Sequence, residues 1–323
     1  MFKRHRNLRK TTGIRKLVRD VYISVDDLVY PLFLEEGTGI KTEISSMPGQ
    51  YRLSLDMLDE ELNILNELGI NSVLLFGIPL EKDSFGKEAY NDIGIVQEGI
   101  KHIKRHSPNM LVITDVCMCE YTSHGHCGII DESGVINDIT IEYMAKIALS
   151  HAKAGADIVA PSDMMDGRIK AIREILDENG FEELAIMSYS VKYASSFYGP
   201  FREAANSAPA YGDRKQYQMD YRFSIDAISE VRSDIEEGAD IVIVKPALSY
   251  LDVIKKIKDT FEVPIVAYSV SGEYSMIKAG SLNGWIDEKN IVMEKTYALK
   301  RAGANIIITY FAKDIARYLR EDK

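Results

Sequence analysis

Short apolar segments alternate with longer amphipathic segments along the 323 residues of the chain. The apolar segments are rich in Val, Ile and Leu, the pattern of strands that are buried on both faces. We expect eight strands, at residues 28–34, 72–78, 110–117, 158–163, 184–190, 241–247, 264–271 and 306–312. Helical segments are expected between the strands, including residues 55–68, 141–153, 167–179, 227–236, 250–260 and 288–302.

A repeated phrase marks the places where a helix ends and a strand begins. Glycine, an aliphatic or small residue and then Asp or Asn come directly before four strands, at Gly69, Gly155, Gly238 and Gly303. Glycine just past a helix end readily takes the left-handed conformation that closes the helix. The strand that follows at once gives the short connection of a repeated β–α unit.

Eight such units predict an α/β fold of the (β/α)8 TIM-barrel class with an extended N-terminal arm. A doubly wound open sheet is the alternative, although no G-x-G-x-x-G motif follows a strand. Two connections are long, at residues 118–137 after the third strand and 193–226 after the fifth. Both leave the carboxyl ends of strands, where barrel enzymes carry their chemistry, so we expect binding loops or a lid there.

Charge divides the chain into a basic start and an acidic remainder. The net charge of −10 makes nucleic acid an improbable partner. No apolar run reaches the ~18 residues of a membrane span, and no signal-peptide pattern is present, so we expect a cytoplasmic protein without a membrane partner. Residues 1–19 contain basic and no acidic residues: Lys3, Arg4, Arg6, Arg9, Lys10, Arg15, Lys16 and Arg19. We therefore divide the chain into an arm at residues 1–25 and a catalytic barrel at residues 26–323. We expect the arm to dock on a partner subunit; a solvated tail, RNA binding and organelle targeting are the alternatives.

Two lysines lie near the ends of predicted strands. Lys245 follows a run of β-branched residues, and Pro246 holds it in an extended conformation. A desolvated lysine has a lowered pKa and attacks carbonyl carbon, whereas a lysine that snorkels to solvent does neither. Lys192 lies two residues after the neighbouring predicted strand, at the same barrel end, and two close ammonium groups disfavour each other's charge. The pair therefore favours amine nucleophiles over solvated strand ends, with one or both neutral near pH 7.

All the cysteines lie in one short stretch: Cys117, Cys119 and Cys127. Their odd number and close spacing argue against a disulfide framework. Three thiolates with one open position suit a catalytic zinc. Asp115 shares strand parity with the first two cysteines, so an extended chain would turn all three to one side. Reduced packed cysteines, or a structural zinc completed by His124 or His126, are the alternatives.

Further polar residues gather at the same predicted barrel mouth. Ser162 and Asp163 follow the fourth strand, as active-site groups or as helix caps. Ser271 and Tyr310 are neutral donors near the ends of the last two strands. The long segment after the fifth strand carries aromatic and cationic residues suited to carboxylate binding, unless they form a solvated surface: Tyr198, Phe201, Arg202, Arg214 and Gln218.

Seven motifs in order carry a resemblance that spans about residues 110–315: TDVCMCEYTSHGHCG, APSDMMDGR, SYSVKYASSFYGPFREA, GDRKQYQMD, GADIVIVKPALSYLD, YSVSGEY and ITYFAKD. With RNLRK and LVYPLFLEEG near the start, the chain closely resembles the porphobilinogen synthase family, also called 5-aminolevulinate dehydratase. The resemblance implies condensation of two 5-aminolevulinate molecules into porphobilinogen, with loss of two waters, in tetrapyrrole (heme) biosynthesis. An ordinary Schiff-base aldolase would need neither the cysteines nor a second lysine, and a zinc-binding scaffold would need no lysines.

The resemblance also implies a role for each matching residue. Lys245 and Lys192 would form the Schiff bases, and the three cysteines would hold a catalytic Zn²⁺. The carboxylate of the first substrate would bind Ser271 and Tyr310. Other active-site groups would be Asp115, Ser162, Tyr198 and Phe201, and the second carboxylate would bind Arg202, Arg214 and Gln218.

Two features of the family concern regulation and assembly. Glu230 matches the ligand of an allosteric Mg²⁺ in some members, although such a residue is equally an ordinary exposed helix residue. The family's N-terminal arm wraps around a neighbouring subunit in a homo-oligomer that is usually an octamer. The basic arm of this chain is consistent with that arrangement.

Overall fold

A closed barrel of eight parallel strands forms the centre of the protein, in a computed structural model that describes residues 2–321. The barrel strands are β1 (Leu28–Glu35), β4 (Ser72–Ile78), β5 (Leu111–Val116), β8 (Ile158–Pro161), β9 (Ala185–Lys192), β10 (Ile241–Lys245), β11 (Ile265–Ser269) and β12 (Ile306–Thr309). Each strand pairs with the next, and β12 pairs with β1 to close the ring. The predicted (β/α)8 barrel is confirmed, and the open doubly wound sheet is excluded.

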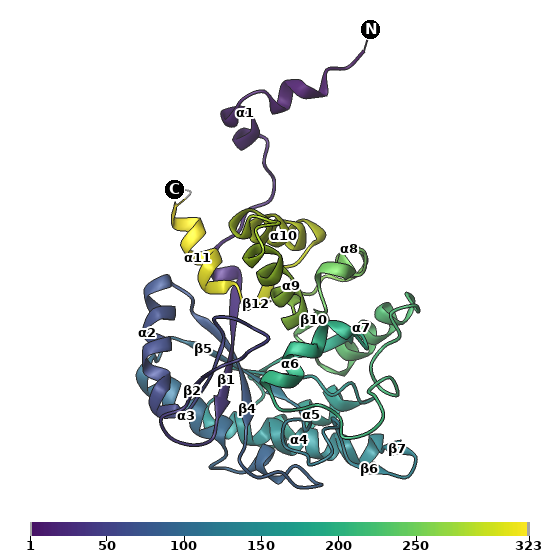
Figure 1. The fold of residues 1–323 in the computed structure, drawn as a ribbon. Helices are drawn as coiled ribbons and strands as arrows, with labels where there is room; N and C mark the ends of the chain where they lie inside the picture. The colour runs from purple at the N-terminus through teal and green to yellow at the C-terminus, as the bar shows by residue number, and fades with distance from the viewer. Residues whose placement is uncertain (1, 322–323) are drawn as a thin grey trace.

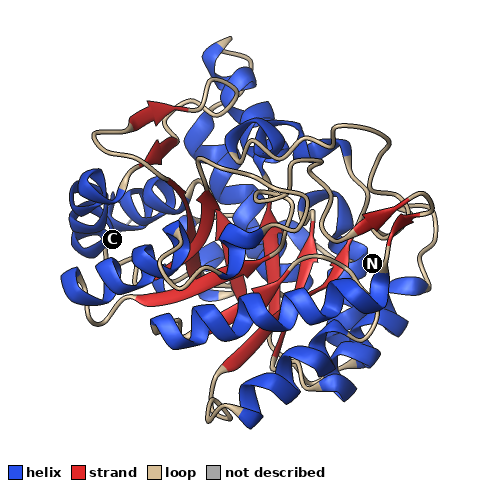
Figure 2. Ribbon diagram, turned by 90° about the horizontal axis from the view of Figure 1, so that it is seen from below, coloured by secondary structure: helices blue, strands red, loops and turns tan. Residues whose placement is uncertain are grey.

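Helices surround the strands on the outside of the barrel (Figure 2). They are α2 (Leu58–Leu68), α3 (Ile95–His106), α4 (Asn137–Ala154), α5 (Arg168–Glu178), α7 (Asp226–Glu237), α8 (Leu251–Thr260), α9 (Ser271–Leu282), α10 (Glu288–Ala302) and α11 (Ala312–Glu321). In α2 the buried residues Leu58, Leu62, Leu65 and Leu68 recur at helical spacing and form one apolar face. That face packs into the main hydrophobic core with the strands.

Every predicted strand is present, but several end elsewhere than expected. β5 stops at Val116, one residue before Cys117, and β8 stops at Pro161. β9 runs two residues further than predicted, so that Lys192 is its last residue. Strand ends depend on where the ladder between neighbouring strands stops, which the hydrophobic pattern of one strand does not contain.

The glycine phrase behaves as predicted at the ends of α2, α4, α7 and α10. Gly69, Gly155, Gly238 and Gly303 all have positive φ, at 77°, 102°, 113° and 125°. The backbone N–H of each donates back to a carbonyl of the helix that it ends. A residue with a Cβ would be strained at these angles, so glycine allows the immediate turn into the next strand.

One strand contains an extra residue. On β10, Val242 and Val244 are two residues apart, whereas their partners on β9, Ser188 and Val191, are three apart. This register shift is a β-bulge in β9. Beyond it, Lys245 of β10 lies directly opposite Lys192 of β9.

The N-terminal arm stands away from the barrel (Figure 1). It contains η1 (His5–Arg9) and α1 (Thr12–Leu17), neither of which contains a buried residue. The single turn η2 (Val25–Asp27) follows where the chain reaches the barrel: Val25 packs against the main core, and Asp27 Oδ1 lies 3.1 Å from Lys300 Nζ. Docking of the arm on a partner subunit stays a prediction. Among the described residues, no helix is long and apolar enough to cross a membrane.

Other short elements lie in the connections between the barrel strands and the helices: β2 (Lys41–Glu43), β3 (Tyr51–Leu53), β6 (Ile130–Asp131), β7 (Gly134–Val135), η3 (Leu55–Met57), η4 (Lys87–Tyr90) and η6 (Leu248–Tyr250). The long segment at residues 193–225, which we call the lid, contains η5 (Ser196–Tyr198) and α6 (Gly199–Ala204). Arg52 of β3 donates to the carbonyl oxygen of Glu203 in the lid over 2.6 Å. The β2–β3 segment therefore holds α6 beside the barrel.

Candidate active site

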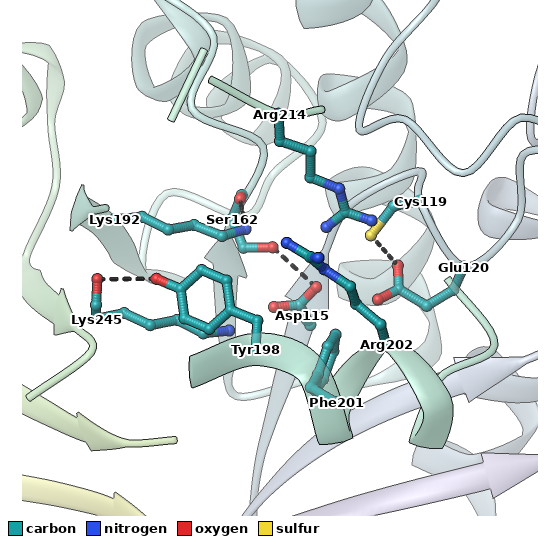
Figure 3. Close-up of a pocket in the computed structure, with 10 residues that line it drawn as sticks. All are labelled: Asp115, Cys119, Glu120, Ser162, Lys192, Tyr198, Phe201, Arg202, Arg214 and Lys245. Atoms are coloured by element: carbon teal, nitrogen blue, oxygen red, sulfur yellow. Dashed lines mark hydrogen bonds between the residues drawn. The ribbon is translucent and has the colours of Figure 1, made fainter. Parts of the chain in front are cut away.

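Lys192 and Lys245 extend side by side into one small cavity at the carboxyl ends of β9 and β10 (Figure 3). Both lysines are 4% exposed. The Nζ atom of Lys245 lies 4.5 to 5.3 Å from the centres of four aromatic rings, those of Tyr268, Phe201, Tyr189 and Tyr198. The rings exclude water from this amine and keep it in a fixed place.

The two lysines differ in their affinity for a proton. Burial lowers the pKa of Lys245 to about 7, and the positive charge of Lys192 contributes to the change. Burial also disfavours the charged form of Lys192, but the nearby cysteines and Asp115 outweigh it and raise its pKa. Lys245 is therefore the amine that is partly neutral near pH 7. The sequence left open whether one lysine or both would be neutral.

Asp115 and Ser162 complete the floor of the cavity beside the lysines. Ser162 donates its hydroxyl hydrogen to Asp115 Oδ2 over 3.0 Å, and the Lys192 ammonium donates to the backbone oxygen of Ser162. Burial raises the pKa of Asp115 to about 7, and Glu120 adds to the increase. Oδ1 of Asp115 has no hydrogen-bond partner within the described chain. A buried carboxyl oxygen is thus available to a bound molecule.

The three cysteines form a buried cluster, with exposed fractions of 2% or less. Their Sγ atoms all lie within 4.8 Å of one another, and those of Cys117 and Cys119 are 3.4 Å apart. They come together although the extended chain that strand parity required does not continue, because β5 ends at Val116. A turn follows, in which Tyr121 and Thr122 donate backbone hydrogen bonds to the Met118 oxygen. The cluster is therefore assembled by a loop.

Gly125 lets the loop return to the cluster. Its φ is 70°, and a Cβ at this position would lie 2.4 Å from the backbone oxygen of Ala208 in the lid. Only glycine fits both the conformation and the close approach. This places Cys127, two residues later, against the other two cysteines.

His124 and His126 are engaged by the loop and the lid. The Nδ1 atom of His126 lies 3.2 Å from the Tyr217 hydroxyl, and Nε2 lies 3.1 Å from the Tyr211 oxygen. His124 Nδ1 accepts the backbone N–H of His126 over 3.1 Å. Neither histidine belongs to the close groups of potential metal ligands found among the described residues. The geometry favours a site of three cysteines over one completed by histidine.

The lid supplies the opposite wall of the cavity (Figure 3). Tyr198, Phe201, Arg202 and Arg214 all line it. Arg214 is anchored by donating to the backbone oxygens of Gly125 and Ser207, at 3.0 and 2.6 Å. The Nε atoms of both arginines have no partner within the described residues. Two guanidinium groups thus face the lysines across the cavity, as the arginine-rich lid predicted.

Other predicted site residues lie outside this cavity. Gln218 and Glu230 line a second cavity together with Asp166 and Asp226. Burial raises the pKa of Glu230 to about 7, and Asp234, Asp226 and Asp166 add to the increase. Both polar side-chain atoms of Gln218 are buried without a described partner. Gln218 therefore lines a different cavity from Arg202 and Arg214, with which the family resemblance grouped it, although its backbone N–H donates to the Arg214 oxygen over 2.9 Å.

Ser271 and Tyr310 lie behind the aromatic rings. Ser271 is the first residue of α9, because β11 ends at Ser269 rather than at 271 as expected. Its Oγ accepts the backbone N–H of Phe201 over 3.0 Å. The Tyr310 hydroxyl lies 3.3 Å from that of Tyr268. Both residues contact groups that surround Lys245, without lining the cavity themselves.

Glu120 also lines the cavity, and it was not among the site residues predicted from the sequence. This carboxylate is 2% exposed and accepts a hydrogen bond from the Cys119 thiol over 3.1 Å. Together with Asp115 and Cys117 it forms a second close group of potential metal ligands. An acidic residue adjoining a cysteine motif was the signal in the sequence, but its burial became evident only in the fold.

A buried arginine, Arg168, contacts the backbone of β9 at its bulge. Arg168 is 2% exposed, and its Nη2 lies 3.1 Å from Asp234 Oδ2 and 3.3 Å from the Tyr189 oxygen at the bulge. Asp163 lies 3.8 Å from Arg168 Nε and accepts the Met165 N–H, and it does not line the cavity. Asp163 therefore closes a local turn and pairs with Arg168, and it does not cap α5, which has no side-chain cap hydrogen bond.

Comparisons with known proteins agree along the whole chain. The family model "Delta-aminolevulinic acid dehydratase" matches residues 2–318. Curated proteins of that name from Halalkalibacterium halodurans and Bacillus subtilis are 56% and 54% identical, over 100% and 99% of this chain and 98% and 99% of the relatives.

A solved structure matches equally far. It is delta-aminolevulinic acid dehydratase (porphobilinogen synthase) from Toxoplasma gondii, in complex with the reaction product porphobilinogen. The match has a TM-score of 0.98 at 43% identity, and covers 100% of this chain and 93% of the other. The chain therefore belongs to the delta-aminolevulinic acid dehydratase family.

Proposed function

We propose that this protein condenses two molecules of 5-aminolevulinate to porphobilinogen, with loss of two waters, in tetrapyrrole biosynthesis. The observation that carries the proposal is the pair of buried amines, Lys192 and Lys245, in register beside a cluster of three thiols. Family membership, and a 43% identical relative solved with porphobilinogen, support the same reaction. An aldolase would need neither the second lysine nor the thiols, and a zinc scaffold would not need the lysines.

Lys245 is the proposed nucleophile toward the first substrate. Its neutral amine attacks the ketone carbon, and loss of water leaves an imine that makes the adjacent carbon acidic. The four surrounding rings hold Nζ in place and keep bulk water away from the imine. Lys192 forms the second imine after it has given up its proton, and Asp115, which lines the same cavity, has a free oxygen to accept that proton.

The carboxylates of the substrates define their orientation. Arg202 and Arg214 are suited to one carboxylate, because guanidinium groups bind carboxylates with two parallel hydrogen bonds. We assign the other carboxylate to Ser271 and Tyr310, and Gln218 to the arginine side, on the basis of the family resemblance. Holding both molecules in one cavity converts a bimolecular bond formation into a local step.

The three cysteines fit a zinc ion, because they supply three soft donors that are buried and close together. When bound, zinc would supply a Lewis acid beside the second substrate. Hydrogen bonds from the other two thiols hold the pKa of Cys127 well below its usual range, whereas burial raises the pKa of Cys117 well above it, so the metal-free cluster provides one thiolate, at Cys127.

We infer two further properties of this protein from the family resemblance. Glu230 would bind an allosteric Mg²⁺ in the second cavity, where Asp166 and Asp226 add negative charge. The exposed basic arm would hold a neighbouring subunit in a homo-oligomer, which we expect to be an octamer.

The decisive experiment measures porphobilinogen formation from 5-aminolevulinate by the purified protein, with borohydride trapping of the substrate. We expect turnover, and a labelled peptide that contains Lys245. Absence of product with zinc supplied would refute the assignment. Turnover by the Lys245→Ala variant at the wild-type rate would refute the role of this lysine.

A further inference from the structure

A buried carboxylate outside the cavity contacts the chain directly after Lys245. Glu273 lies in the first turn of α9 and is 1% exposed. Its Oε1 atom accepts the backbone N–H groups of Ala247 and Leu248, over 3.1 and 3.0 Å. Because Pro246 has no N–H, these are the first two backbone donors after Lys245. Glu273 thus holds the segment that leaves the end of β10.

The other side of Lys245 is held by the lid. The backbone oxygen of Lys245 accepts the Tyr193 N–H over 3.0 Å and the Tyr198 hydroxyl over 3.1 Å. Two groups therefore restrain the carbonyl of Lys245, and one carboxylate restrains the next two amides. The direction of a side chain follows from its backbone, so these contacts define where the amine points.

An ordinary helix-capping role does not account for Glu273. Acidic residues in a first turn stabilise a helix through its own N-terminal amides and its dipole. The hydrogen bonds of Glu273 go to the loop after β10, on a different β–α unit. Burial raises the pKa of Glu273, and the opposing effect comes first from Lys295.

Lys295 carries the positive charge that compensates the buried carboxylate of Glu273. It projects from α10, is 4% exposed, and donates to the Ser269 hydroxyl over 2.7 Å. Burial of a carboxylate costs stability unless charges and hydrogen bonds compensate it. The fold therefore retains a buried carboxylate, which is unfavourable by itself, next to the segment that follows Lys245. The buried positive charge of Lys295 compensates it.

We propose that Glu273 is a positioning residue that fixes the backbone after Lys245 and so aims its amine at the first substrate. This inference rests on the proposed function, because it takes Lys245 as the residue that reacts. Glu273 acts through the strand end and contacts no substrate. Positioning requires an acceptor atom at the place of Glu273 Oε1. The negative charge of Glu273 compensates the positive charge of Lys295.

Substitutions separate the acceptor from the charge. Glu273→Ala removes both, and Glu273→Asp keeps the charge on a side chain that is too short to reach the amides. The Glu273→Gln, Lys295→Met double variant keeps an acceptor and removes both buried charges. Glu288→Gln is the matched control, because it breaks an ion pair with Lys278 between α9 and α10 without contacting the segment after Lys245.

Three measurements test the proposal: hydrogen–deuterium exchange at residues 246–250, kcat and KM, and borohydride trapping mapped to Lys245. For Glu273→Ala and Glu273→Asp we expect faster local exchange and a loss of about 10- to 100-fold in kcat. KM and the exchange of distant segments should stay near the wild-type values. The double variant should recover most of the kcat and the slow exchange, and Glu288→Gln should match the wild type.

Several results would overturn the proposal. One is wild-type kcat and trapping in the Asp and Ala variants. Another is exchange that increases equally throughout the barrel, which would indicate general destabilisation. If Ala does not fold, Asp and the double variant decide the question. A wild-type protein that traps no substrate on Lys245 refutes the proposed function instead, whereas local exchange still reports whether Glu273 holds the segment.

Discussion

Lys192 and Lys245 are directly opposed in the register of β9 and β10, so two primary amines occupy one end of the barrel within a single pair of strands. Burial and the charge of Lys192 bring the pKa of Lys245 to about 7. An ordinary lysine has a pKa of 10.5, so the fold keeps this amine in a state that it would not have in an unfolded chain.

Lys245→Met should make the protein more stable while it abolishes turnover. Between pH 7 and 10.5 the unfolded state binds more protons than the folded state, so the free energy of unfolding rises with pH in this window. The cost of Lys245 is therefore fully present below about pH 7 and absent above about pH 10.5. We expect a gain of about 2–4 kcal/mol at pH 7, and a smaller gain at pH 9.

Urea denaturation at both pH values, at one protein concentration, checks this prediction. Lys255→Met is the control, because Lys255 lies on the outside in α8 and pairs with Asp259. A Lys245→Met variant that is less stable than the wild type at both pH values would contradict the pKa argument.

Arg168→Met should be strongly destabilising. The substitution leaves Asp234 and Asp163 buried without their cation, and breaking a buried pair in this way costs about 3–5 kcal/mol. Adding Asp234→Leu should restore part of the lost stability, since it removes one uncompensated charge. Thermal or denaturant unfolding of the single and double variants measures the effect, and an additive further loss in the double variant would argue against the pairing.

Cys119→Ala should remove bound zinc and activity together. The loss of one of three soft donors from a buried cluster leaves too few ligands to retain the ion, so metal content should fall from about one zinc per chain to near zero. Metal analysis after dialysis provides a measurement that does not depend on turnover. His124→Asn is the comparison, and it should keep its zinc. Loss of zinc from the His124→Asn variant would instead favour a zinc site that a histidine completes.

Glu230→Gln should abolish any stimulation by magnesium without removing basal activity. The amide retains the shape of the side chain but lacks the charge that Mg²⁺ requires. Activity titrated with MgCl2, at constant zinc and ionic strength, is the measurement. Glu236→Gln on the exposed side of the same helix serves as the control. Equal stimulation of both variants would place the magnesium elsewhere.

The hydrophobic pattern was sufficient to predict the eight strands. Buried strands read as continuous apolar runs, and the glycine phrase marks four helix ends directly, so both are local properties of the sequence. Closure of the ring is not local, since it depends on pairing between the first strand and the last. The count of strands implied closure, but only the fold decides it against an open sheet.

The lysines and cysteines were predictable because their chemistry is unusual for buried positions. How the cysteines come together was not, because the turn after Val116 ends the strand parity on which the prediction relied. Glu120 and Glu273 were missed for a different reason. Acidic residues are common on surfaces, and nothing in the sequence reveals that these two are buried.

The bulge in β9 makes the second amine depend on the length of a strand as well as on its composition. Side chains alternate in direction along a strand, so deleting one residue between Ser188 and Val191 would turn Lys192 out of the barrel while leaving its identity unchanged. A relative with every residue of this site but a one-residue gap here would therefore be expected to lack the reaction. Gaps in this strand are as informative about activity as substitutions of the lysine itself.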